Sequence, residues 1–262
     1  MHILSSIKVF NKETKKVNDK DIEEFFFNGK LPLSERIFFV QHLMPYVLFR
    51  HLCTGKRVLE IGIGKGFGSY YLSKVAKDVI SLDFDYSCYY FLRQYLERYC
   101  IPNIRFINAN AVYLPFIDRS FDCVITCQVI EHIELQKLNL FLQEIFRVLK
   151  NGGICLISTL NVEHSIKNTF TYEKFYQHEK EFNKNEFENL LRDIFPKIEI
   201  IGLDIGLKHR FYQRLKKWGF MKYNFCGFNP VLHFYNNILP KDFIFSENVT
   251  KRSRDLIALC LK

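Results

Sequence analysis

Several features that mark other classes of protein are missing from this sequence. No segment approaches about 18 uninterrupted apolar residues, the length of a transmembrane helix, and the apolar part of residues 1–6 is too short for a signal peptide. No Cys-x-x-Cys pair occurs, and the eight cysteines are scattered, several of them within apolar segments. There is no internal repeat and no low-complexity linker. We therefore expect a cytoplasmic protein with reduced thiols, no transmembrane segment and no bound metal ion.

The composition is that of a globular protein with a basic balance. The chain has 262 residues, of which 48% are hydrophobic, enough for one large domain or one domain with a substantial addition. Its net charge of +9 favours anionic partners such as nucleic acid, phosphate-bearing small molecules or a lipid surface. Lysine is spread along the whole chain, however, so a general bias of composition explains the charge at least as well.

From residue 57 onward, short apolar segments alternate with segments of helical character. This alternation predicts an α/β protein with a Rossmann-like, mostly parallel sheet of seven strands and helices on both faces. Ligands bind such sheets beyond the carboxyl ends of the strands. The expected strands are 57–61, 78–83, 103–107, 121–126, 154–158, 197–202 and 255–261, with a turn at 151–153 before the fifth. We expect an N-terminal helical cap over 1–54, a ligand-binding core over 55–205, an insert or lid over 206–250, and the last strand of the core within 251–262.

A glycine-rich turn follows the first strand. Gly62, Gly64 and Gly66 allow the backbone to turn sharply and to approach a ligand closely. Phe67 stands where the dinucleotide fingerprint has its third glycine, which argues against a diphosphate site. Glu60 lies just before the turn, where a carboxylate suits a cationic or amino-bearing ligand.

Polar and aromatic residues follow the next strands. Asp83 ends the second strand, where a carboxylate accepts hydrogen bonds from a ribose diol, and Phe84 beside it can lie against an adenine ring. After the third strand, Asn110 and Ala111 can line the adenine edge, with the amide oxygen accepting from the amino group. Cys127, at the end of the fourth strand, is assigned to the same pocket. These positions predict a nucleoside site without a diphosphate anchor.

Five motifs in order resemble those of the class I S-adenosylmethionine-dependent methyltransferases, and most of all the small-molecule and glycan-cluster branch (methyltransferase type 11-like). The resemblance covers roughly residues 55–160 and implies S-adenosylmethionine as cofactor and methyl transfer as activity. Asn110 departs from it, because the family usually has Asp there. The matching segments are 60–66, the acidic Asp83, 110–116, 121–133 and 147–153.

Candidate catalytic and substrate-binding residues come from the same resemblance and from position. His132, in the Glu131-His132 pair, is the candidate general base, although the pair can equally serve to hold its loop. His164 and His178 follow the fifth strand, where acceptors usually enter. Arg36, in the N-terminal cap, can clamp an acceptor phosphate or the cofactor carboxylate, with a surface role as the alternative.

The methyl acceptor stays open at this stage. The first hypothesis is O- or N-methylation of a small molecule or glycoconjugate, including anionic ones. The second is methylation of RNA or protein, and the third is a non-catalytic cofactor-binding module. Basic and aromatic residues interleave in the 206–250 insert, which suits an anionic-acceptor lid, a nucleic-acid surface, a membrane-contacting helix or an ordinary packed helix. No Asn-Pro-Pro-Tyr sequence occurs, which argues against amino methylation of DNA bases.

Overall fold

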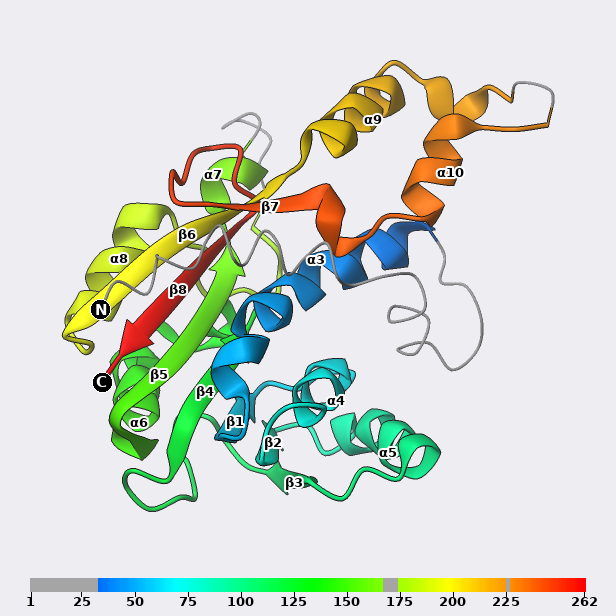
Figure 1. The fold of residues 1–262 in the computed structure, drawn as a ribbon. Helices are drawn as coiled ribbons and strands as arrows, with labels where there is room; N and C mark the ends of the chain where they lie inside the picture. Colours follow the sequence, from blue (N-terminus) through cyan, green and yellow to red (C-terminus); the bar gives the residue numbers. More distant parts are fainter. Residues whose placement is uncertain (1–32, 167–173, 225–226) are drawn as a thin grey trace.

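The protein is built on an eight-stranded sheet covered by helices on both faces (Figure 1). The structure is a computed structural model that describes residues 33–166, 174–224 and 227–262, so the first part of the predicted N-terminal cap lies outside the described residues. The strand order is β3-β2-β1-β4-β5-β8-β6-β7. The strands are β1 (Arg57–Ile61), β2 (Asp78–Asp83), β3 (Ile104–Asn108), β4 (Phe121–Cys127), β5 (Leu149–Leu160), β6 (Lys197–Ile205), β7 (Phe243–Ser246) and β8 (Asp255–Leu261).

Strands β1 to β5 run parallel, which confirms the predicted Rossmann-like, mostly parallel sheet. Strand β8 enters between β5 and β6 and pairs antiparallel with both. The strand order reverses direction at β1, with β2 on one side and β4 on the other. This switch point is where a sheet of this kind leaves a crevice for a ligand.

The sheet contains one strand more than the seven predicted. Strand β7 lies within the 206–250 insert and pairs with β6, where Phe245 stands opposite Leu203. Phe243 and Phe245 are buried and Ile244 between them is exposed, which is the two-residue period of a strand. An alternation of four residues inside an aromatic-rich segment is too short to predict from sequence. Strand β5 is also longer than predicted: it begins at Leu149, and the expected turn at 151–153 is an irregularity within it.

Each face of the sheet has its own hydrophobic core. On one face, α3, α4 and α5 contribute Leu43 and Leu92 to a cluster that includes Ile125 of β4. On the other, α6 and α8 contribute Phe141 and Phe187. The helices are α3 (Leu33–Phe49), α4 (Phe67–Ser73), α5 (Cys88–Tyr99), α6 (Leu138–Val148), α7 (Val162–Ser165), α8 (Lys184–Arg192), α9 (Leu207–Lys217) and α10 (Pro230–Asn236).

Helix α3 crosses the carboxyl edge of the sheet. Near its end, the Tyr46 hydroxyl donates to Glu60 Oε1 of β1 at 2.6 Å. Earlier in the same helix, Gln41 Nε2 donates to Asp255 Oδ1 at 2.9 Å. Asp255 is the first residue of β8 and pairs with Leu160 at the end of β5. A single helix therefore contacts the edge from β1 to β5 and β8.

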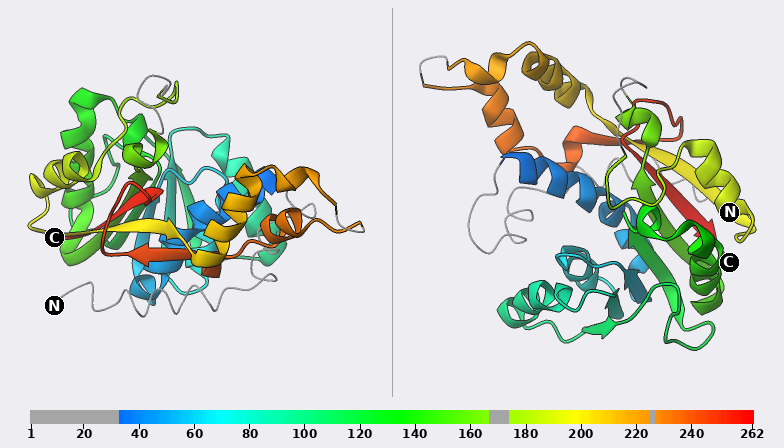
Figure 2. Two further views of the ribbon diagram at one scale, coloured as in Figure 1. Left: turned by 90° about the horizontal axis from the view of Figure 1, so that it is seen from above. Right: turned by 180° about the vertical axis from the view of Figure 1, so that it is seen from behind.

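Helices α9 and α10 form a projection beyond the sheet, which we call the arm and define as residues 207–236. Figures 1 and 2 show the arm standing out from the body in three views. The two helices are joined by aromatic stacking, with the rings of Tyr212 and Phe234 4.2 Å apart and nearly parallel. Among the helices that the structure describes, none combines the length and the apolar character needed to cross a bilayer.

Candidate active site

The glycine-rich turn after β1 surrounds open space. Gly62, Gly64 and Gly66 all have positive φ angles, which glycine adopts without strain. A Cβ added at Gly62 would collide with Val129, whereas one added at Gly64 would meet no described atom within 4 Å. The backbone at Gly64 is therefore exposed to a space that a ligand can enter.

Asp83 lies beside this space, at the end of β2. Its carboxylate accepts from two backbone donors, the N–H of Gly64 at 3.2 Å and the N–H of Asp85 at 3.0 Å, one on each oxygen. Each carboxylate oxygen has a further lone pair, so two additional hydrogen bonds can be accepted. Asn108, which the sequence analysis missed, donates from Nδ2 to the carbonyls of Asp83 and Phe84, both at 2.9 Å, and so joins the ends of β2 and β3.

Glu60 is buried beneath the turn and is already hydrogen-bonded there. Tyr46 donates to one carboxylate oxygen and Ser69 to the other, and Ser69 also contacts the Ser81 hydroxyl at 2.6 Å. Burial raises the pKa of Glu60 to about 7. Because both oxygens face protein hydroxyls, we assign Glu60 the role of supporting the turn, in place of the direct ligand contact suggested by its sequence position. Tyr46 lies in α3, far from the motif, and no local pattern marks it.

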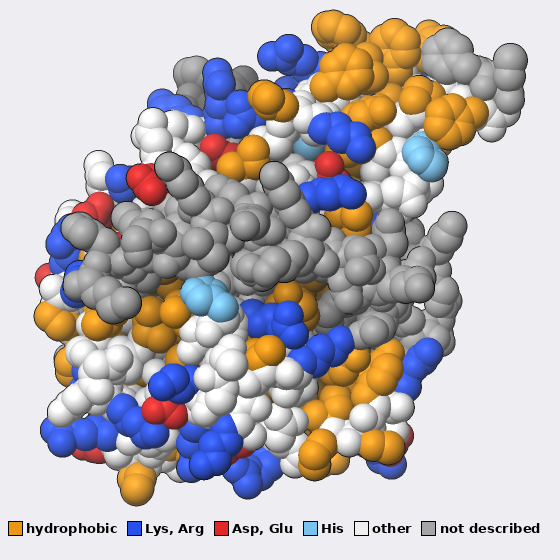
Figure 3. Space-filling view, in the orientation of Figure 1, with side chains coloured by type: hydrophobic (Ala, Val, Ile, Leu, Met, Phe, Trp, Pro, Cys, Tyr) orange, Lys and Arg blue, Asp and Glu red, His pale blue; other side chains and the backbone are white. Residues whose placement is uncertain are grey.

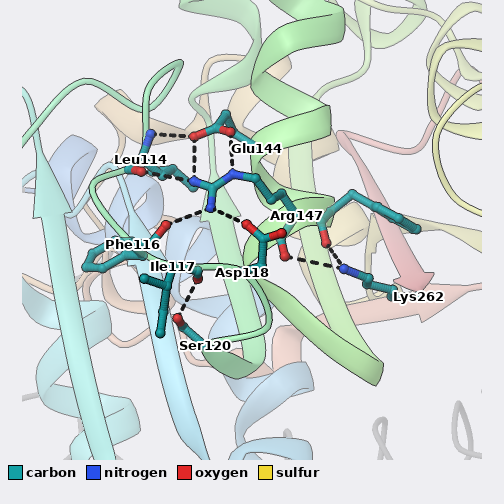
Figure 4. Close-up of polar contacts among 9 residues, drawn as sticks. Leu114, Phe116, Ile117, Asp118, Ser120, Glu144, Arg147 and Lys262 are labelled. Atoms are coloured by element: carbon teal, nitrogen blue, oxygen red, sulfur yellow. Dashed lines mark hydrogen bonds and ion pairs between the residues drawn. The ribbon is translucent and has the colours of Figure 1, made fainter.

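The loop between β3 and β4 is tied to α6 by one arginine (Figure 4). Arg147 donates to the carbonyls of Leu114 and Phe116 at 3.0 and 2.6 Å, and to Asp118 Oδ1 at 2.8 Å. Glu144, one turn earlier, accepts from Arg147 and from the Leu114 N–H at 2.7 Å. We call this group the Arg147 clasp. It holds the loop that begins with Asn110 and Ala111.

A second group of polar side chains lies at the carboxyl ends of β4 and β5. Among the described residues, five buried side-chain oxygens here have no hydrogen-bond partner. Leaving such oxygens buried and unsatisfied costs roughly 1–3 kcal/mol each, so at this edge polar atoms of a ligand or ordered water would be stabilised. They belong to Thr126, Glu131 (both oxygens), Ser158 and Thr159.

Asp255 extends this group toward α3. Both of its carboxylate oxygens accept from Gln41 Nε2, at 2.9 and 3.0 Å. Burial raises the pKa of Asp255 to about 7. The carboxyl ends of β4 and β5 and the start of β8 thus carry buried groups that accept hydrogen bonds.

Comparison with known proteins identifies the family. Residues 59–157 match the model described as a methyltransferase domain. A probable S-adenosylmethionine-dependent methyltransferase of Mycobacterium tuberculosis is 32% identical over 196 residues, 74% of this chain and 64% of that protein. The chain thus contains a class I S-adenosylmethionine-dependent methyltransferase domain. The fatty-acid O-methyltransferase of Mycolicibacterium smegmatis is 33% identical over 114 residues, 43% of this chain and 40% of that methyltransferase. The chain thus spans less than two thirds of the length of these curated relatives.

Solved structures share the methyltransferase fold. The YcgJ protein of Bacillus subtilis aligns with a TM-score of 0.59 at 17% sequence identity, over 84% of this chain and 99% of that chain. At that identity the likeness concerns the fold alone.

S-adenosylmethionine, the cofactor of this methyltransferase family, fits the space beside Gly64 and Asp83. The bare backbone of Gly64 leaves room, and Asp83 has lone pairs for a ribose diol. Phe84 has 81% of its surface exposed next to Asp83, as an adenine-stacking ring would need. Asn110 Oδ1 accepts from the Val112 N–H at 2.9 Å, so the oxygen assigned to adenine also holds its own loop. Ala111 is buried in that loop and Cys127 is half-buried at the end of β4.

In the Glu131-His132 pair, the side chain of Glu131 is buried and the side chain of His132 is exposed. Glu131 is buried, and burial raises its pKa to about 8. The Thr159 hydroxyl is near enough to oppose this rise in part, although it does not meet hydrogen-bond geometry. His132 is exposed, and its Nδ1 lies 3.0 Å from the carbonyl oxygen of Gln177. The sequence analysis selected His132 as the base, but it is Glu131 that reaches the buried polar group.

The other candidate residues take different positions. His178 is buried, with Nδ1 2.7 Å from Glu181 Oε1 and its ring 4.9 Å from that of His132. Burial lowers the pKa of His178, which favours the neutral ring. His164 lies on the short helix α7 after β5. Arg36 is buried on α3 and donates to the Ile238 carbonyl at 3.3 Å, so the structure places it between α3 and the segment that follows the arm. In the described residues no group of side chains has the arrangement of a metal site.

Proposed function

We propose that this protein transfers the methyl group of S-adenosylmethionine to a hydroxyl oxygen of a small molecule or lipid. The observation that carries the proposal is the group of unsatisfied buried oxygens around Glu131, at the same carboxyl edge of the parallel strands as Gly64 and Asp83. The ionised Glu131 carboxylate only accepts hydrogen bonds, and the hydroxyls of Thr126, Ser158 and Thr159 can also accept one, so the group suits a ligand that donates a hydrogen bond, as an acceptor hydroxyl does. Buried carboxyl groups disfavour an anionic acceptor group at this point.

The bound cofactor supplies a sulfonium methyl group that an oxygen lone pair can displace in line. Asp83 and the turn at Gly64 would hold its nucleoside, and the Arg147 clasp would keep the adenine loop in place. Helix α3 and the ends of β4 and β5 would orient the acceptor and exclude water.

Glu131 would receive the proton of the acceptor hydroxyl. Its raised pKa of about 8 brings it into the range where a carboxylate is an effective base near neutral pH. Thr159 and Asp255 lie close enough to Glu131 to influence its ionisation and would hold the acceptor beside it. His132 would position the segment around Gln177, to which its ring is hydrogen-bonded.

The acceptor class is supported by the relative that is named for it. The fatty-acid O-methyltransferase of Mycolicibacterium smegmatis is 33% identical over 114 residues, and its name specifies methylation of a fatty acid at oxygen. From this relative we take methylation at oxygen and a lipid acceptor into the proposal. We propose a hydroxyl group as the methylated group in place of a carboxylate, because the buried carboxyl groups of Glu131 and Asp255 disfavour an anion there.

The test is a transfer assay with methyl-labelled S-adenosylmethionine and cell extract separated into lipid, small-molecule, RNA and protein fractions. We expect label in the lipid or small-molecule fraction. Glu131→Gln should lower turnover by about 100-fold, the usual size of a general-base contribution, with unchanged affinity for the cofactor. Glu134→Gln, an exposed carboxylate on the same segment, is the matched control. Label confined to RNA or protein, or full turnover by Glu131→Gln, would contradict the proposal.

A further inference from the structure

The arm lies in a segment of the chain that has no acidic residue. Between Asp204 and Asp242 there is neither Asp nor Glu. The same stretch carries seven bases: Lys208, Arg210, Arg214, Lys216, Lys217, Lys222 and Lys241. The segment is therefore uniformly positive, whereas the rest of the chain mixes both signs.

Helix α9 of the arm has two different faces. Its inner face packs on α10 through Tyr212, which stacks on Phe234, and through the buried His209. Its outer face exposes Leu207 and Phe211, and Trp218, the residue directly after the helix, continues this face; 79%, 57% and 71% of their surfaces are accessible. These three positions are four and seven residues apart, so they form one stripe along the helix.

Basic side chains border this stripe. Because successive helical residues are 100° apart around the axis, Arg214 lies within the apolar stripe. Arg210 and Lys217 lie on one side of the stripe, and Lys208 lies on the other. The long stems of such side chains can lie along an apolar surface while their charged ends reach water or anions. Figure 3 shows hydrophobic side chains gathered on the projecting arm, with Lys and Arg beside them.

The base of α9 borders a basic hollow. A cavity of about 380 Å³ is lined by the bases Arg210, Lys251 and Arg252 and by the hydroxyl groups of Ser246 and Thr250. Asp204 and Asn248 complete the lining, and Asp204 Oδ2 lies 3.9 Å from Arg210 Nη2. The cations thus exceed the single carboxylate, and the hollow suits an anionic head group close to the apolar stripe.

We propose that the outer face of α9, made by Leu207, Phe211, Arg214 and Trp218, docks on a membrane surface that contains anionic phospholipid. Interfacial helices have this arrangement, with an apolar stripe that enters the head-group region and flanking bases that meet lipid phosphates. A nucleic-acid surface would place bases at the centre of the contact, whereas here an aliphatic and two aromatic side chains occupy the centre. The proposal concerns binding and does not depend on the reaction proposed above.

Trp218 provides a direct readout, because it is the single tryptophan of the chain. We expect its fluorescence to shift to shorter wavelength when vesicles of phosphatidylcholine and phosphatidylglycerol are added to the intact protein, and the shift to weaken with salt. Vesicles of phosphatidylcholine alone should leave the spectrum nearly unchanged. No shift with anionic vesicles, or an equal shift with both kinds, would overturn the proposal.

Sedimentation with the same vesicles tests the stripe itself. The triple variant Leu207→Ser, Phe211→Ser, Trp218→Ser should bind anionic vesicles at least 10-fold more weakly than the unchanged protein. The matched control replaces three exposed apolar side chains elsewhere, Tyr90, Tyr113 and Ile117, by Ser and should bind normally. Equal loss in both variants, or retention of RNA without vesicle binding by the unchanged protein, would refute a lipid-docking face.

Discussion

At the scale of single residues, the position of Asp83 is decided by the backbone around it. Two N–H donors hold its carboxylate, which leaves one lone pair on each oxygen toward the open space at Gly64. Asp83→Asn keeps the shape but loses the charge and one acceptor. We expect about 10- to 100-fold weaker binding of S-adenosylhomocysteine, the equivalent of roughly 1.5–3 kcal/mol for a charged hydrogen bond. Titration calorimetry measures the affinity, and an unchanged value would remove the ribose assignment.

The pH dependence of turnover tests Glu131 separately. A base acts only when ionised, and the pKa of Glu131 is raised to about 8, so the rate should climb as the pH rises from 6 to 9 with a midpoint near 8. Glu131→Gln should flatten this climb as well as lower the rate. A climb that persists in Glu131→Gln and disappears in His132→Ala would instead identify His132 as the base.

The sequence marks the residues proposed for the cofactor side of the site more clearly than those proposed for the acceptor side. Gly64 and Asp83 are marked by local chemistry, because a positive φ and a strand-end carboxylate have few other uses at that spacing. Glu131 and His132 are neighbours in the chain, and which one faces inward depends on how their turn packs under residues 175–182. Tyr46 reaches Glu60 from a helix outside the motif, a contact that exists only in the folded chain.

At the scale of elements, the Arg147 clasp joins α6 to the loop that carries Asn110. Arg147→Ala removes donors from two carbonyls and leaves Glu144 without its partner. We expect a loss of about 2 kcal/mol in the free energy of unfolding and faster hydrogen exchange over residues 109–118. Arg147→Lys should recover only part of this, since an ammonium cannot reproduce the planar fork. Arg93→Ala, which breaks an exposed pair with Glu97, is the control and should change little.

Elements with a strong periodic signal were predicted well, and short or irregular ones were not. Strand β8 was predicted to its bounds because its apolar run is continuous. Strand β7 was missed since four residues carry too little alternation. Gly152 and Gly153 indicated a turn before β5, whereas pairing with β4 and β8 draws both residues into the strand around an irregular register. In these cases tertiary contacts outweigh the local preference.

At the scale of the whole molecule, three buried acids make stability depend on pH. Burial raises the pKa of Glu60, Glu131 and Asp255 to about 7, 8 and 7, from ordinary values of 4.5, 4.5 and 3.8. The folded protein therefore binds more protons than the unfolded chain between about pH 4.5 and 8, so the free energy of unfolding should fall as the pH rises through that window.

Thermal unfolding at pH 5.5 and 8.5 measures this effect. The melting temperature should be lower at pH 8.5, and Asp255→Asn should narrow the difference, because an amide at that position does not titrate. A melting temperature that rises with pH over this range and is unaffected by Asp255→Asn would contradict the raised pKa values of these carboxyl groups.

The position of α3 has a thermodynamic consequence for the two ligands. Helix α3 touches the nucleoside half of the edge through Tyr46 and the acceptor half through Gln41, with Pro45 between them, so a shift of this helix would couple the two halves. Thermodynamic linkage requires this coupling to be mutual. If the bound acceptor changes the dissociation constant of S-adenosylmethionine by a given factor, bound S-adenosylmethionine changes the dissociation constant of the acceptor by the same factor.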